Sequence, residues 1–187
     1  KASKQEIIRR YYQALCEKRR AGETKKNISK LENLMQQAQI TVEDRKVIVE
    51  ALKKEKETDG KPAVALELPN GKIVTGSTSD LLGAAAAALL NGIKALGEIE
   101  DDVKLIAKEA IEPIQILKTN YLGSKNPRLH TDEILIALSS TAAHNENAKK
   151  AMSQLHKLKG CDAHSTVLLS SVDENIFKKL GIQLTCE

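Results

Sequence analysis

The hydrophobic pattern of this chain changes its period at Pro62, and this change constrains the fold more than any other feature. Before Pro62, apolar residues recur every three or four positions, as they do in helices. After it, residues 63–68 alternate as in a β-strand, and Asn70-Gly71 separates them from a second apolar run, 73–75. Asn-Gly between two strands favours a tight hairpin in which both turn residues have positive φ. An antiparallel hairpin inside an otherwise α/β pattern predicts a mixed sheet.

Helical patterns fill most of the remaining sequence. Ser3 and Thr41 each precede an acidic residue by three positions, a spacing typical of helix caps. Pro113 fits its helix only in the first turn. Residues 21–28 and 123–130 are expected to be loops. The predicted helices span 3–20, 28–39, 41–57, 80–96, 109–121, 132–143 with Thr131 as cap, 146–157 and 173–179, and further strands are predicted at 103–106, 165–170 and 182–186.

These patterns predict an α/β fold in two parts. Residues 62–187 form a three-layer domain with a mixed sheet, a β-hairpin and an alanine-rich helix, in which the run 84–88 lets a neighbouring element approach closely. Residues 1–61 form a helical segment that packs on this domain or bridges to further sequence. Both ends of the chain are expected to be cut from a longer protein, since it starts at Lys1 and stops directly after a strand-like run.

Composition excludes several classes of protein. With 41% hydrophobic and 29% charged residues the chain is globular and not disordered. Only 2% of the residues are aromatic, which predicts an aliphatic, alanine-rich core and argues against a stacking platform for single-stranded nucleic acid. Residues 1–61 carry 16 Lys and Arg against 10 Asp and Glu. This basic arm is interpreted as a solvated helical face, and nucleic acid is not the expected partner.

The cysteines and the hydropathy indicate a cytoplasmic location. Cys16, Cys161 and Cys186 are odd in number and widely spaced, which is typical of reduced thiols. No apolar run approaches the roughly 20 residues that a membrane-spanning helix needs, and no targeting pattern is present. A membrane partner is therefore not expected.

The first candidate ligand site is the polar turn before the alanine-rich helix, with Thr75, Gly76, Ser77, Thr78 and Ser79. Backbone N–H groups and the positive end of the helix dipole favour anions there, and the hydroxyls add donors. Glycine permits close approach of a ligand to the backbone. The alternative is an ordinary polar turn with a helix cap. No Gly-x-x-x-x-Gly-Lys-Ser/Thr motif occurs, so this is not a standard P-loop.

The second candidate is the loop that contains Lys125, Asn126, Arg128 and His130. Arg128 can clamp a phosphate or carboxylate with two hydrogen bonds, and Lys125 adds a point charge. His130 can act as an acid or base near neutral pH. The alternative is a structural loop in which Arg128 pairs with an acid such as Asp132.

Three further residues are candidates for catalysis. Cys161-x-x-His164 has a spacing that can chelate a metal, or can serve as nucleophile and base, although one such pair provides fewer ligands than zinc needs. The alternative is a buried structural pair, and no metal is assigned. Glu112 can act as a general base, whereas a carboxylate that compensates the helix dipole in the first turn is the simpler interpretation.

The predicted order of hairpin, Thr-Gly turn, alanine-rich helix, strand and helix is similar to the layout of cytidine-deaminase-like domains. Those enzymes need His/Cys-x-Glu and Pro-Cys-x-x-Cys motifs for zinc binding and proton transfer. Neither motif occurs in this chain. The similarity therefore concerns architecture alone.

Four stretches resemble one bacterial family, namely residues 2–12, 68–76, 112–133 and 159–166. The most specific is Gly-Ser-Lys-Asn-Pro-Arg-Leu-His, from Gly123 to His130. Together they resemble the domain of unknown function 1846, also called uncharacterised protein family 0371. The resemblance implies a parent two to three times longer, with this region on its C-terminal side and a Gly-rich segment similar to a phosphate-binding loop in the preceding part. It implies no catalytic residue.

We therefore expect this chain to contribute an anion- or phosphate-binding wall to a nucleotide- or phosphate-dependent active site, which the preceding sequence completes. The ligand would be small and anionic, and the residues identify neither a cofactor nor a reaction. The alternative is a structural oligomerisation module, in which the alanine-rich helix and the N-terminal apolar stripes bury against a second copy.

Overall fold

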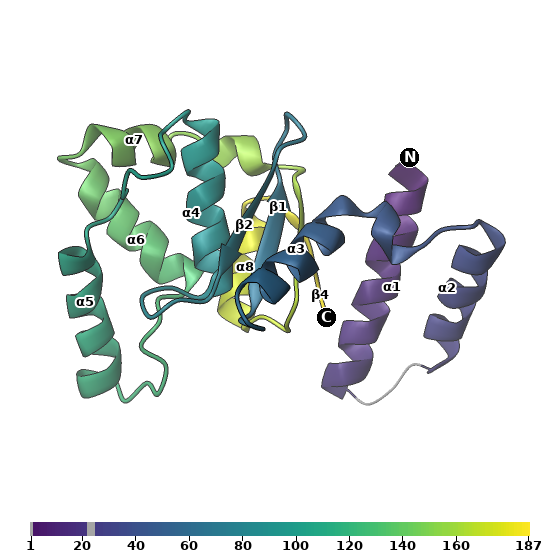
Figure 1. Ribbon diagram of the computed structural model, residues 1–187. Coiled ribbons are helices and arrows are strands. Elements are labelled where there is room, and N and C mark those ends of the chain that lie inside the picture. The colour runs from purple at the N-terminus through teal and green to yellow at the C-terminus, as the bar shows by residue number, and fades with distance from the viewer. Residues whose placement is uncertain (1, 22–24) are drawn as a thin grey trace.

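The computed structural model describes residues 2–21 and 25–187. Within these residues the chain forms eight α-helices, a four-stranded mixed sheet and three short helical turns of other types (Figure 1). In chain order the elements are α1 (Ala2–Ala21), α2 (Lys25–Gln37), η1 (Val42–Asp44), α3 (Lys46–Glu57), β1 (Ala63–Glu67), β2 (Ile73–Ser77), α4 (Ala84–Leu96), α5 (Lys108–Ile116), η2 (Leu117–Tyr121), α6 (Thr131–Ala142), α7 (Glu146–Met152), η3 (Leu155–Leu158), β3 (Asp162–Ser165), α8 (Ser171–Lys179) and β4 (Gln183–Cys186).

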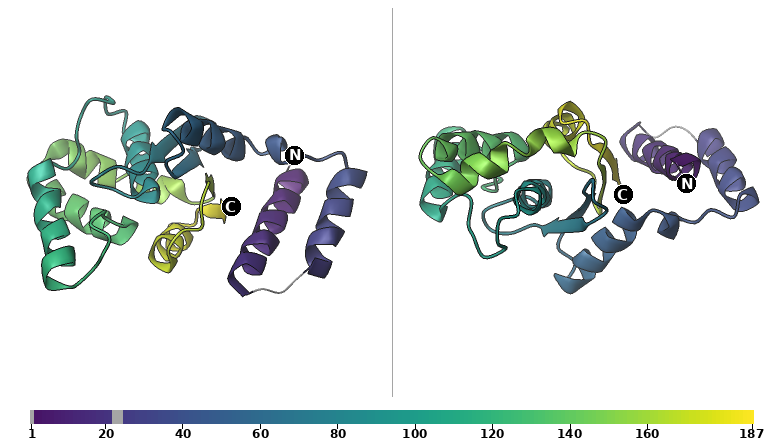
Figure 2. Two further views of the ribbon diagram at one scale, coloured as in Figure 1. Left: turned by 60° about the horizontal axis from the view of Figure 1, so that its bottom comes forward. Right: turned by 90° about the horizontal axis from the view of Figure 1, so that it is seen from above.

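The sheet has the strand order β2-β1-β3-β4 and lies at the centre of the molecule. Strand β1 is antiparallel to both β2 and β3, and β3 is parallel to β4. Helix α3 packs across β1, β2 and β3, while α4 packs on β1 and β2 from the other side, as the two further views confirm (Figure 2). The predicted three-layer α/β fold with a mixed sheet is thus confirmed.

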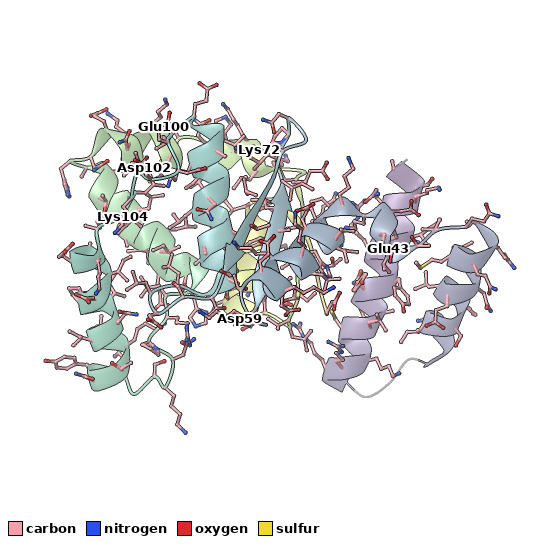
Figure 3. All side chains as sticks on the ribbon, viewed as in Figure 1. Glu43, Asp59, Lys72, Glu100, Asp102 and Lys104 are labelled. Atoms are coloured by element: carbon pink, nitrogen blue, oxygen red, sulfur yellow. The ribbon has the colours of Figure 1, made fainter. Side chains whose placement is uncertain are left out.

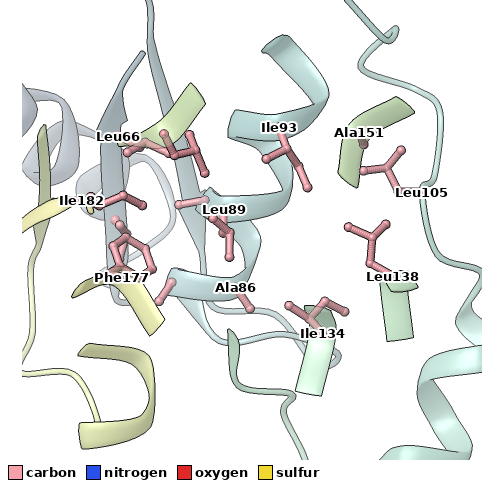
Figure 4. Packing of buried hydrophobic residues seen from close by; sticks show 14 of the residues in the cluster. Leu66, Ala86, Leu89, Ile93, Leu105, Ile134, Leu138, Ala151, Phe177 and Ile182 are labelled. Atoms are coloured by element: carbon pink, nitrogen blue, oxygen red, sulfur yellow. The ribbon is translucent and has the colours of Figure 1, made fainter. Parts of the chain in front are cut away.

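Strand β1 is buried on both faces, which explains its apolar sequence. Val64 and Leu66 face the main core with α4, whereas Ala65 packs against Val47 and Ala51 of α3. The main core is aliphatic and rich in alanine, as composition predicted (Figure 4). Its one aromatic side chain is Phe177 of α8, which is completely buried.

The helices α1 and α2 form an arm beside the edge strand β4. Ile8 and Tyr12 of α1 meet Met35 of α2 and Ile48 of α3 in a second small core. Two arginines of this arm pair with acidic residues: Arg10 pairs with Glu6 within the helix, and Arg20 pairs with Glu174 of α8. Side chains such as Glu43, Asp59 and Lys72 lie exposed on the outside of the molecule (Figure 3).

The hairpin forms where it was predicted, but its turn type differs. Gly71 N–H donates to the Leu68 carbonyl and Leu68 N–H to the Lys72 carbonyl, both at 2.8 Å. Gly71 has φ of 83°, whereas Asn70 is not among the residues with positive φ. The expectation of positive φ at both turn residues was therefore wrong. Pro69 and Asn70 form the turn and Gly71 the following bulge, which is the usual three-residue hairpin.

Several predicted boundaries were also wrong. The alanine-rich helix begins at Ala84 and not at residue 80, because β2 continues through Gly76 and Ser77. Residues 103–106 form no strand, although Leu105 and Ile106 are buried, and the strand predicted at 165–170 lies instead at Asp162–Ser165. Pro113 lies in the interior of α5.

Three capping and loop predictions need similar correction. The cap of α6 is His130 and not Thr131, and Thr41 precedes the 3-10 turn η1, with Arg45 as the cap of α3. Helix α2 already begins at Lys25, inside the predicted loop 21–28, of which residues 22–24 lie outside the described residues. No helix of the described residues is long and apolar enough to cross a membrane.

Candidate functional site

A cleft of about 370 Å³ opens where α4 begins, and parts of both predicted ligand-binding segments line it. Thr78 comes from the first segment, and Lys125, Asn126, Arg128 and His130 come from the second. The remaining wall comes from the residue before β1, the start of α4, the loop before α6, and the start of α8 with the segment before it. Its residues are Pro62, Gly83, Ala84, Ala85, Pro127, Leu129, Val167, Leu168, Leu169, Ser170 and Asp173.

Hydrogen bonds to backbone carbonyls hold the two segments together. Leu82 and Leu129 form an isolated parallel bridge, in which Leu129 N–H donates to the Leu81 carbonyl at 2.9 Å. Gly83 N–H donates to the Leu129 carbonyl at 3.2 Å. Arg128 Nε donates to the Ser79 carbonyl at 2.6 Å. These bonds join segments that lie almost 50 positions apart in the chain, so the cleft is a product of the fold and not of one motif.

The first turn of α4 has backbone N–H groups that donate to no acceptor within the described residues. Ala84, Ala85 and Ala86 are at most 5% exposed, and their N–H groups have no acceptor within residues 2–21 and 25–187. The N-cap residue is Gly83, which has no side chain to accept from these N–H groups, and the first turn of the helix holds no acidic residue. Buried backbone N–H groups normally find an acceptor, and the dipole makes this end of the helix positive. An anion in the cleft would accept hydrogen bonds from these N–H groups and would interact favourably with the positive end of the helix.

Helices α6 and α8 also begin at this cleft, but side chains of this chain already accept from N–H groups at their starts and place carboxylates there. The carboxylate of Glu133 accepts from His130 N–H at 2.8 Å. Asp173 Oδ1 accepts from both N–H and Oγ1 of Thr131, and Ser170 Oγ accepts from Asp173 N–H. The start of α4 is therefore the end best prepared for an outside anion.

Arg128 is held so that most of its guanidinium stays available. Only Nε is used, by the Ser79 carbonyl, and within the described residues Arg128 forms no ion pair. The alternative in which Arg128 pairs with Asp132 is thus wrong. The two terminal amino groups remain for a ligand, which is the arrangement that a bidentate clamp needs.

Hydrogen bonds inside the loop and from Lys118 hold the backbone around Arg128 in place. Asn126 Oδ1 accepts from Arg128 N–H at 3.1 Å, and Ser124 Oγ accepts from Asn126 N–H at 3.2 Å. Lys118 is buried, and its ammonium group donates to the Arg128 carbonyl at 2.6 Å and to Glu133 Oε1 at 2.7 Å. The loop therefore presents Arg128 from a fixed backbone.

His130 is placed beside a buried carboxylate. Its Nδ1 lies 3.4 Å from Asp173 Oδ2 and 3.4 Å from Ser170 Oγ, and its side chain is 30% exposed. Asp173 is 7% exposed. A carboxylate at Nδ1 fixes the orientation of an imidazole and leaves Nε2 for proton transfer. Sequence reasoning missed Asp173, because its partner lies 43 positions away and only its place in the first turn of α8 distinguishes it.

The other residues of the first segment do not line this cleft. Thr75, Gly76 and Ser77 belong to strand β2, and the Thr75 carbonyl accepts from the Asn91 side chain at 2.8 Å. Gly76 is buried against the backbone of Ala88. Ser79 uses its hydroxyl for the N–H groups of Leu81 and Leu82, and its carbonyl for Arg128. The expectation that these residues directly open the helix was wrong, because the strand is longer than predicted.

Glu112 lies outside the cleft. It is an exposed residue in the second turn of α5, and its Oε1 forms an ion pair with Lys108 Nζ at 3.2 Å. The prediction that Glu112 lies in the first turn of its helix was therefore wrong, and Glu112 does not line the cleft.

Cys161 and His164 lie on opposite sides of the sheet, because side chains alternate along a strand. Cys161 belongs to the main core, and burial raises the pKa of its thiol. His164 is completely buried beside Tyr12 of the arm, with ring centroids 4.9 Å apart, and burial lowers its pKa. The two side chains therefore do not meet as nucleophile and base or as ligands of one metal.

His164 instead belongs to a buried polar network that the sequence did not reveal. Arg45 is 0% exposed and donates to both carboxylate oxygens of Asp162, at 2.8 and 2.7 Å, and to Thr185 Oγ1. Thr185 Oγ1 lies 2.8 Å from His164 Nδ1, and Glu187 Oε1 lies 3.3 Å from His164 Nε2. This network ties α3 to the sheet.

Comparison with known proteins identifies the family. Residues 43–187 match the family model "Domain of unknown function DUF1846, C-terminal". UPF0371 proteins of Corynebacterium glutamicum (strain R) and Streptococcus thermophilus (strain CNRZ 1066) are 50% and 53% identical over 186 and 184 residues, covering 100% and 98% of this chain. The chain spans 37% of the length of these curated relatives. It belongs to the DUF1846 family and corresponds to its C-terminal part.

Proposed function

We propose that this C-terminal part of a DUF1846 protein supplies an anion-binding wall to a phosphate- or nucleotide-dependent active site. The observation that carries the proposal is the meeting of Arg128, His130 and the uncapped start of α4 at one cleft. Each of these elements favours a negatively charged oxygen, and they come from separate parts of the chain. A phosphate group, with several acceptor oxygens, can use all of them at once.

The elements of the cleft would have distinct roles. The N–H groups of Ala84 and Ala85 would bind one oxygen of the anion, and the terminal amino groups of Arg128 would bind others. Lys125 is exposed at the rim, where a point charge attracts anions without fixing their geometry. His130, oriented by Asp173, would donate or accept a proton at Nε2.

The rest of the active site would come from sequence outside this chain. The chain spans 37% of the length of its relatives, and the resemblance noted above implies a Gly-rich segment in their preceding part. The cleft is open along the side of Lys125, Asn126 and Arg128, so a surface from that preceding part could close over a ligand bound there. We place the protein in the cytoplasm, as the odd and widely spaced cysteines favour.

Calorimetric titration with inorganic phosphate, pyrophosphate and ATP tests this proposal on the chain and on the full-length protein. Arg128→Ala removes two donors to a charged ligand, so binding should weaken by about 1–3 kcal/mol. This loss corresponds to roughly a 5- to 150-fold rise in the dissociation constant.

The matched control is Arg10→Ala, which removes an exposed arginine of α1 that pairs with Glu6. Its affinity should equal that of the wild type, because α1 does not line the cleft. Equal affinities of Arg128→Ala and wild type would refute the role of Arg128. Absence of binding to all three anions by the full-length protein would refute the proposed function itself.

A further inference from the structure

The cleft at the start of α4 has an apolar part that the anion-binding groups do not use. Val167, Leu168 and Leu169 line the same cleft as Arg128, and their side chains are aliphatic. Leu168 is 37% exposed although it is a large apolar residue. We call these three residues the apolar surface. Single apolar residues on the outside of a protein need no explanation, whereas apolar side chains in a cleft with a few polar groups are typical of a small-molecule site.

Hydrogen bonds at both ends hold the apolar surface in place. Thr166 N–H donates to the Ala63 carbonyl at 3.0 Å, and Thr166 Oγ1 accepts from Ala63 N–H at 3.1 Å. Ser165 Oγ donates to the Val167 carbonyl at 2.7 Å and accepts from Val167 N–H at 3.3 Å. At the other end, Ser170 caps helix α8. The apolar surface is therefore a preformed part of the cleft, so a ligand would not have to order it before binding.

The charges that line the cleft are complementary to an anion. Lys125 and Arg128 are its cationic residues, and of the described residues that line it Asp173 is the only one with a carboxylate. Asp173 Oδ1 accepts two hydrogen bonds from Thr131, and Asp173 Oδ2 lies 3.4 Å from His130 Nδ1. This carboxylate thus has partners within the chain, and the cationic groups remain for a ligand.

The cleft is larger than a phosphate group needs. Sites of about 300–1,000 Å³ hold small organic molecules, and this cleft has a volume of about 370 Å³. A phosphate bound by Arg128 and the N–H groups of α4 would fill only part of it. The apolar surface would then contact whatever organic group the phosphate carries.

We propose that the cleft binds a nucleoside phosphate, with the phosphate at Arg128 and the start of α4 and the base against the apolar surface. This proposal rests on the function proposed above and names its ligand. The face of a base is apolar, and covering it with aliphatic side chains removes that surface from water. A sugar phosphate suits the cleft less well, because its hydroxyls need polar partners and residues 167–169 have no polar side chain.

The backbone of Leu168 favours a base over an alkyl chain. Its N–H and carbonyl groups form no hydrogen bond within the described residues, whereas those of Val167 are both used by Ser165 Oγ. The edge of a base carries hydrogen-bond donors and acceptors that such free backbone groups can pair with. An alkyl chain packed on Leu168 would cover these groups without offering them a partner.

Calorimetric titration of the full-length protein with AMP, ribose-5-phosphate and pyrophosphate tests the proposal. AMP should bind at least about 10-fold more tightly than ribose-5-phosphate, which is AMP without its base. Leu168→Ser removes part of the aliphatic surface, so it should raise the dissociation constant of AMP by about 3- to 10-fold. The same variant should bind pyrophosphate as the wild type does, because pyrophosphate has no group that reaches the apolar surface.

The matched control is Val172→Ser, in the first turn of α8. Val172 is 38% exposed, almost the same fraction as Leu168, but it does not line the cleft, so this variant should bind all three ligands as the wild type does. Equal affinities for AMP and ribose-5-phosphate would overturn the proposal. So would unchanged AMP affinity in Leu168→Ser, since AMP would then bind elsewhere in the protein. In both cases pyrophosphate binding that Arg128→Ala weakens would leave the proposed function standing, whereas absence of binding to all three ligands would overturn both.

Discussion

Gly76 is the position where a single methyl group should disturb this fold most clearly. A Cβ atom there would lie 2.2 Å from the Ala88 backbone nitrogen and 2.7 Å from the Ala87 carbonyl carbon. Ordinary contacts of this kind begin near 3.4 Å, so strand and helix would have to separate by about 1.2 Å. Both obstructing groups are backbone atoms, which no rotamer change can move.

The free-energy change of Gly76→Ala is the balance of two effects. Replacing glycine by alanine where φ is not positive stabilises a protein by about 0.4–1 kcal/mol through the unfolded chain. Overpacking a well-packed contact costs about 1–3 kcal/mol, with larger values where the backbone must shift. The backbone clash places Gly76→Ala at the upper end of that range, so we expect a net loss of about 2–3 kcal/mol.

Gly92→Ala is the matched comparison. Its added Cβ would meet Leu66 Cδ2 at 2.8 Å, which is the end of a side chain that can turn. Alanine in a helix interior gains about 1 kcal/mol over glycine, which offsets that adjustment and leaves a net change within about 1 kcal/mol of zero. Urea unfolding followed by circular dichroism measures both variants. Equal stabilities of Gly76→Ala and Gly92→Ala would refute the reasoning, because the added methyl group meets immovable backbone at Gly76 and the end of a side chain at Gly92.

Two predictions concern the buried network around Arg45. Asp162→Asn leaves the buried guanidinium of Arg45 without its carboxylate and should lower the free energy of unfolding in urea by about 3–5 kcal/mol. Glu6→Gln removes the partner of an exposed arginine and should lower it by less than about 1 kcal/mol. Similar losses in the two variants would contradict the role of burial. Burial lowers the pKa of His164 below its ordinary 6.5, so the folded state binds fewer protons than the unfolded chain below that pH. The contribution of His164 to the free energy of unfolding should therefore be complete above about pH 6.5 and should be lost as the pH falls toward the folded-state pKa. If a His164→Gln variant showed the same dependence of stability on pH as the wild type, His164 would not be its cause.

Periodicity predicted the elements whose signals are local. The hairpin between residues 63 and 77 was predicted because alternating residues flank Asn70-Gly71, and α1 because its apolar stripe is continuous. The start of α4 was misplaced because glycine and serine are typical of turns. Gly76 and Ser77 belong to β2 instead, because Gly76 pairs with Val64 and because α4 packs closely against this strand. A local sequence pattern contains neither contact.

Long-range contacts account for the residues that sequence reasoning missed. Arg45 was assigned to a solvated basic arm, yet its carboxylate partner Asp162 lies 117 positions away and makes it one of the most buried residues. Asp173 likewise acquires its place from His130 and Thr131. Lys118 would ordinarily be exposed, and only the carbonyl and carboxylate it meets explain its burial. Charged residues carry no sequence signal for burial, because their partners are set by tertiary structure.

The contact at Gly76 also links the fold to the proposed anion site. Ala88 follows Ala84 and Ala85 by one helical turn, so the distance between α4 and β2 at Gly76 sets where their N–H groups point. The bridge from Leu82 to Leu129 then fixes the Arg128 loop relative to the same helix end. A shift of about 1 Å at Gly76 would therefore change the geometry of the donors without altering any residue of the cleft. Gly76→Ala should weaken binding of pyrophosphate as well as stability, while Gly92→Ala, in the next-to-last turn of the helix, should leave affinity unchanged. Retained affinity in a destabilised Gly76→Ala variant would show that the start of α4 does not bind the anion.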